Sequence, residues 1–158
     1  MTDQTNVCFT FDAACDAAIE MESRIYQDFL KAIRIVKDRA AIEILRDAAI
    51  VRFGIKQKLE LAALEGGLQG QAVQGPVPTL NLNIRCCDLH HINADADNRK
   101  ALAYAIQMSK DALRFYRGMA EQCSGAPMAA LFAALGDDQT QYLQHLEDTY
   151  EERFLTEG

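Results

Sequence analysis

The chain carries an internal repeat, because a shift of 87 residues places its first half on its second half. Similar residues then coincide at many positions: Ala18-Ile19 with Ala105-Ile106, Met21 with Met108, Phe29 with Tyr116, Ala48-Ala49 with Leu135-Gly136, and Leu59-Glu60 with Leu146-Glu147. Each half reads as two helices. The repeat therefore predicts a duplicated helical hairpin.

Four segments carry apolar residues at the 3.6-residue period of an amphipathic helix. They predict helices over residues 12–37, 39–65, 96–122 and 127–155. Between the second and third helices lies a long crossover, residues 66–95, whereas the other two connections are short. Short, long and short connections indicate an up-down-down-up bundle with one crossover. We therefore expect an all-α four-helix bundle that forms a single domain over residues 1–158.

Acidic residues and glycines mark the expected helix ends. Asp12 and Asp38 are placed as N-caps of the first two helices, and Asp95 or Asp97 as the N-cap of the third. Gly66-Gly67 predicts the end of the second helix, because glycine adopts the backbone conformation that commonly terminates a helix.

Composition excludes several classes of function. The net charge is -7, which argues against nucleic-acid binding through a basic face. No apolar run is long enough to span a bilayer, so no membrane partner is expected. Met1 to Thr10 shows no secretory signal, and the expected location is cytoplasmic. Five cysteines in a chain with this much core are expected to be reduced.

The two stretches Ala18-Ile19-Glu20-Met21-Glu22 and Ala105-Ile106-Gln107-Met108-Ser109-Lys110, with Phe29 and Tyr116 after them, resemble the rubrerythrin-like branch of the ferritin-like superfamily. The resemblance covers about residues 12–155. It implies a ferritin-like bundle of two repeated helical hairpins and a homodimer. It also implies descent from proteins with a di-iron centre that act in peroxide reduction or iron handling.

In that family, one Glu from each of two helices and a Glu-x-x-His from each of the other two hold the iron. The repeat assigns these six positions to Glu22, Arg52, Ile55, Ser109, Gln139 and Tyr142. Glu22 alone keeps a ligand of the family type. A slip of one residue restores no further ligand, so the resemblance implies a degenerate di-iron centre.

An arginine at a ligand position changes the electrostatics of the centre. Two unit charges about 4 Å apart interact by about 4 kcal/mol at an effective dielectric constant near 20, so Arg52 repels a cation and attracts Glu22. One prediction is an internal Glu22–Arg52 ion pair, with Ser109, Gln139 and Tyr142 completing a polar network. The alternative is that Arg52 extends to the surface and Glu22 is solvated.

Two classes of function follow from the degenerate centre. The first is a non-catalytic binding or structural module, without a cofactor, that holds an unknown protein or small-molecule partner. The second is an iron-binding oxidoreductase that uses Glu22 in a reshaped site. A different register would bring together Glu43, Asp47, Asp137 and Asp138, although these more naturally lie on an outer face.

The crossover contains a separate group of candidate metal ligands: Cys86, Cys87, Asp88, His90 and His91. Thiolates and imidazoles of this kind could bind zinc or another thiophilic metal. Their spacing is not that of a zinc finger, so a connector without metal is the favoured interpretation.

Overall fold

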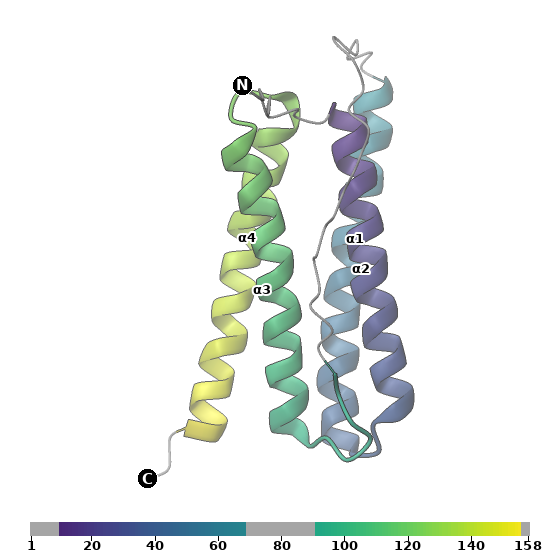
Figure 1. The fold of residues 1–158 in the computed structure, drawn as a ribbon, viewed down its shortest axis with the longest axis vertical. Coiled ribbons are helices and arrows are strands. Elements are labelled where there is room, and N and C mark those ends of the chain that lie inside the picture. Colours follow the sequence, from purple (N-terminus) through teal and green to yellow (C-terminus); the bar gives the residue numbers. More distant parts are fainter. Residues whose placement is uncertain (1–9, 69–90, 156–158) are drawn as a thin grey trace, which may run out of the picture.

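The computed structural model describes residues 10–68 and 91–155, which form an all-α bundle (Figure 1). Its helices are α1 (Phe11–Ile35), α2 (Arg39–Leu68), α3 (Asn98–Gln122) and α4 (Pro127–Tyr150), and a π-helical turn, Glu151–Leu155, continues α4. The four helices expected from the apolar period are thus confirmed. No helix within the described residues is both long enough and apolar enough to cross a membrane.

The helices associate as two antiparallel pairs (Figure 1). α1 packs along α2, and α3 packs along α4. α2 and α3 run in the same direction and provide most of the contact between the pairs. Side chains from all four helices therefore reach the space between the pairs.

Side-chain caps define three of the helix starts. The Thr10 hydroxyl accepts a hydrogen bond from the Ala13 backbone N–H at 3.1 Å, so α1 begins at Phe11 and the prediction that Asp12 is its N-cap is wrong. The hydroxyl is sufficient for this cap, because it satisfies a backbone donor in the first turn. Asp38 accepts from Ala41 at 3.0 Å and Asp97 accepts from Lys100 at 2.9 Å, which confirms both as caps.

Gly66 does not end α2, which continues to Leu68. A Cβ atom at Gly66 would lie 2.6 Å from the Phe11 ring. The glycine therefore permits the first turn of α1 to pack against the α2 backbone. Its role is a close approach between helices, and the prediction that it terminates the helix is wrong.

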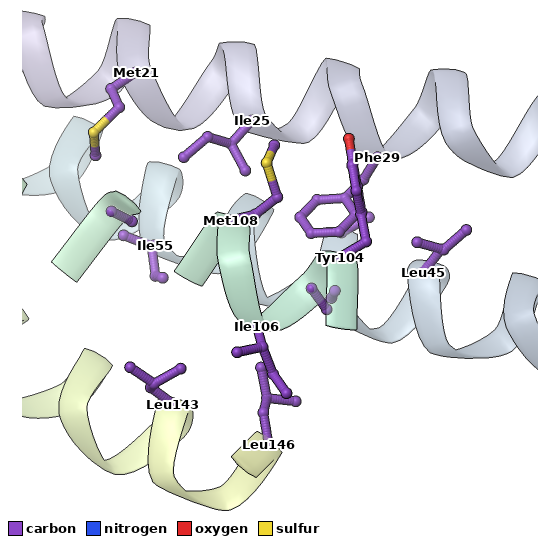
Figure 2. Packing of buried hydrophobic residues seen from close by; sticks show 14 of the residues in the cluster. Met21, Ile25, Phe29, Leu45, Ile55, Tyr104, Ile106, Met108, Leu143 and Leu146 are labelled. Atoms are coloured by element: carbon purple, nitrogen blue, oxygen red, sulfur yellow. The ribbon is translucent and has the colours of Figure 1, made fainter. Parts of the chain in front are cut away.

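Apolar side chains from the four helices fill the space between the pairs (Figure 2). Met21 and Met108, which coincide under the repeat, are both buried. The rings of Phe29 and Tyr104 meet edge to face, with centroids 5.5 Å apart. On the α3–α4 side, Ile106 lies against Leu146, near Leu143 (Figure 2).

The two cysteines within the described residues differ in oxidation state. Cys15 is a free thiol buried on α1. Cys123, just after α3, is disulfide-bonded, so the expectation of reduced cysteines is wrong at that position. The remaining three cysteines lie outside the described residues.

Candidate functional site

A small set of polar side chains is buried at the centre of the bundle. Each of the four helices contributes one of them, and together they are the buried polar residues of the described part of the chain: Glu22, Arg52, Ser109 and Gln139. All four are positions that the repeat assigned to the centre. The other two assigned positions also lie inward, because Ile55 is buried and Tyr142 is half-buried.

Glu22 and Arg52 form an ion pair inside the bundle. The Arg52 Nη1 group donates to Glu22 Oε1 at 3.1 Å and lies 3.4 Å from Glu22 Oε2. The two side chains are 0% and 1% exposed. The predicted internal pair is therefore confirmed, and the alternative in which Arg52 extends to the surface is wrong.

The second guanidinium nitrogen of Arg52 faces α4. Nη2 donates to the amide oxygen of Gln139, and the Tyr142 ring centroid lies 5.9 Å from the guanidinium carbon. An aromatic face at this distance attracts a cation. Gln139 thus joins the hydrogen-bond network as expected. Tyr142 contacts Arg52 through its ring, and a hydrogen bond from its hydroxyl stays a prediction. Ser109 is buried on α3, and a hydrogen bond from its hydroxyl to the network stays a prediction.

The Tyr116 hydroxyl is a member of the network that sequence reasoning missed. It donates to Glu22 Oε1 at 2.8 Å, while the ring packs edge to face against Phe132. Tyr116 lies at helical spacing from other aromatic residues, a pattern that predicts only packing of its ring in the core. The one signal in the sequence is its repeat mate Phe29, which has the same ring but lacks the hydroxyl.

Burial dominates the protonation behaviour of the cluster. Loss of solvent raises the pKa of the Glu22 carboxyl above its ordinary value, and the charge of Arg52 and the hydrogen bond from Tyr116 oppose that rise. Burial also raises the pKa of Tyr142, again against the charge of Arg52. The desolvation cost of the carboxylate therefore exceeds what its partners recover.

The buried polar side chains of the cluster have hydrogen-bond partners within the protein. Within residues 10–68 and 91–155, no fully buried side-chain nitrogen or oxygen lacks a hydrogen-bond partner. Carboxylate and guanidinium are directed at each other and at neutral side chains of the same cluster. The charges of the carboxylate and the guanidinium therefore neutralise each other within the cluster.

The other candidate ligands give no assembled metal site in the described part of the chain. Over those residues, no three His, Cys, Asp or Glu side chains gather closely enough to hold an ion. His91 is exposed, and the rest of the crossover group, Cys86, Cys87, Asp88 and His90, lies outside the described residues. The carboxylates of the alternative register, Glu43, Asp47, Asp137 and Asp138, are all exposed.

No protein-family model, curated protein or solved structure matches this chain.

Proposed function

We propose that this chain is a ferritin-like, rubrerythrin-type bundle that has lost its di-iron centre and acts as a non-catalytic binding or structural module. The observation that carries the proposal is the Arg52 guanidinium, which lies buried between the helices and is bonded to Glu22 and Gln139. All three residues occupy positions that correspond, by the resemblance to rubrerythrins, to iron ligands.

Charge supports the loss of the centre. Two ferrous ions bring four positive charges, and the family neutralises them with four carboxylates. Here the six positions contribute one carboxylate and one guanidinium, whose charges cancel. Hard cations are bound poorly where a fixed positive charge already occupies the site.

The helix arrangement supports the ferritin-like assignment. α1 and α2 form one antiparallel pair, α3 and α4 form the other, and the two inner helices run in the same direction (Figure 1). The 87-residue spacing of Arg52 and Gln139 relates equivalent positions of the two halves. This geometry is the one that a duplicated hairpin with a single crossover requires.

The first test is the iron content of the chain, purified without chelator or tag-bound metal and then loaded with Fe(II) under anaerobic conditions. We expect iron near zero and no oxo-bridged absorption when oxygen is added. About two irons per chain would overturn the proposal and favour an iron oxidoreductase acting on peroxide. One tightly bound zinc would instead indicate the crossover group.

A reconstruction tests the ancestry directly. The variant combines Arg52→Glu, Ile55→His, Ser109→Glu, Gln139→Glu and Tyr142→His, which with Glu22 restores four carboxylates and two imidazoles. We expect it to bind about two irons per chain. The matched control carries the last four substitutions but keeps Arg52, and it should bind none. If the variant with all five substitutions is helical and monodisperse but binds no iron, the ferritin-like assignment is contradicted.

A further inference from the structure

The outer face of α2 exposes large apolar side chains. Ile50, Phe53, Leu61 and Leu64 are 65%, 42%, 55% and 62% exposed, and they are four of the six large hydrophobic residues exposed in the described part of the chain. With Gln57 between them, they follow one another at intervals of three or four residues. We call these four residues the α2 stripe.

The α2 stripe lies opposite the buried face of the same helix. Leu45, Ala48 and Leu59 point into the core, about half a turn away from Ile50, Phe53 and Leu61 in helical angle. A surface helix is normally apolar on one face only. A row of exposed, large apolar side chains on its second face is typical of an interaction site.

A groove beside the α2 stripe extends the apolar surface onto α1. It has a volume of about 260 Å³, and Tyr26, Leu30 and Ile33 of α1 form one wall. On the opposite wall, Phe53 packs against Tyr26 with ring centroids 5.7 Å apart. The surface around Phe53 therefore combines an exposed aromatic ring with an adjacent apolar depression.

Charged residues flank Phe53 with the spacing that a symmetric pair requires. Arg46 and Glu60 are both exposed and lie seven residues before and after Phe53, two helical turns in either direction. In an antiparallel pair of α2 helices centred on Phe53, each Arg46 faces Glu60 of the second copy. The same pairing places Ile42 opposite Leu64.

We propose that the chain forms a twofold-symmetric homodimer through the outer face of α2, with Phe53 on the axis and Arg46 facing Glu60 of the second copy. An interface of this kind uses the same patch on both subunits, so it needs both charge signs in one patch. Residues 42–64 span about 33 Å of helix, a length suited to a standard interface of about 800 Å² per subunit. The inference is independent of whether the bundle once held iron.

The oligomeric state of the full chain gives the first test, measured by sedimentation equilibrium at micromolar concentration. We expect a dimer for the native chain and at least a tenfold weaker dimer for Phe53→Glu, which places two like charges at the axis. The matched control is Leu155→Glu, an exposed apolar position away from α2, and it should remain dimeric. A native monomer, or a Phe53→Glu chain that dimerises as well as the control, would overturn the proposal.

A charge exchange tests the register. Arg46→Glu and Glu60→Arg should each weaken the homodimer about tenfold, because each creates two repulsive pairs. A mixture of the two single variants should form a heterodimer, since both cross-pairs are then attractive. The double variant should recover native affinity. If the mixture of the two single variants dimerises no better than either variant alone, Arg46 and Glu60 do not face each other. Circular dichroism of each variant checks that it is folded, so that a loss of dimer is not caused by unfolding.

Discussion

Arg52 and Gln139 occupy the same position in the two halves of the chain, and their side chains bond to each other at the centre of the bundle. Equivalent positions meet only where the two halves face one another. Two arginines there would repel, and two glutamines would leave Glu22 without a counter-charge. The cluster is therefore built from unlike residues at like positions: Glu22 with Ser109, Arg52 with Gln139, Ile55 with Tyr142, and Phe29 with Tyr116.

Replacement of Arg52 by alanine should strongly destabilise the chain. It leaves the Glu22 carboxylate buried without its counter-charge, and breaking one side of a buried pair costs about 3–5 kcal/mol. Urea unfolding followed by circular dichroism measures the free energy of unfolding.

The control is Arg24→Ala, at an exposed arginine that lies 3.5 Å from Glu20 on the surface of α1. Surface substitutions of this kind change stability by about 0.5 kcal/mol or less. Equal free energies of unfolding for the two variants would show that the buried Glu22–Arg52 pair contributes no more to stability than a surface pair.

Tyr116→Phe should lower the free energy of unfolding by about 1.5–3 kcal/mol, because it removes a hydrogen bond to a buried charged group. The ring and its contact with Phe132 are retained. Tyr26→Phe, at a half-buried tyrosine on the outer side of α1, serves as the comparison and should cost much less. If both variants are equally stable, the Glu22–Tyr116 hydrogen bond is not stabilising.

Stability should fall as pH rises through and above the ordinary Glu range. Burial raises the pKa of Glu22 in the folded chain above its ordinary value of 4.5, so over that interval the folded chain keeps a proton that the unfolded chain has released. This contribution to stability is fully present below 4.5 and is lost as pH rises to the folded pKa.

Glu22→Gln isolates the effect, because glutamine does not titrate. The free energy of unfolding of the native chain, taken relative to this variant, should decrease between pH 4.5 and neutrality. A difference that grows with pH would mean that Arg52 and Tyr116 outweigh burial and lower the pKa of Glu22.

Cys15 should react slowly with alkylating reagents in the folded chain. Burial, followed by the charges of Asp12 and Asp16, raises the pKa of its thiol to about 11. At pH 8 the thiolate fraction is then about one in a thousand, so alkylation should be at least a hundredfold slower than in denaturant. Peptide mass spectrometry distinguishes Cys15 from the other cysteines, and equal rates in both states would contradict the burial of its thiol.

The helices were predictable because their information is local. The apolar period predicts all four helices. The repeat predicts that Glu22 and Arg52 lie at the centre, because their separation along the chain equals that of Ser109 and Gln139. The end of α2 was misplaced, because the reason for Gly66 is a contact with Phe11, which is far away in the sequence.

The direction of the Arg52 side chain could not be decided from the sequence. An arginine stem is long enough to follow an apolar surface outward to water, so burial depends on partners from other helices. One of those partners, Gln139, comes from α4. The Tyr116 hydroxyl, from α3, acts on the other side of the ion pair, because it donates to Glu22. The role of the hydroxyl is not predictable either, because the spacing of an aromatic residue along a helix indicates that its ring is buried but not where its hydroxyl points.

The pairing of Glu22 with Arg52 also constrains how this sequence can change over generations. A mutation of either residue alone leaves the other charge buried without its counter-charge. Lineages that alter one position therefore carry a less stable chain until a second mutation removes or replaces the remaining charge. The two codons behave as a single inherited unit, and across descendants they should be kept together or replaced together.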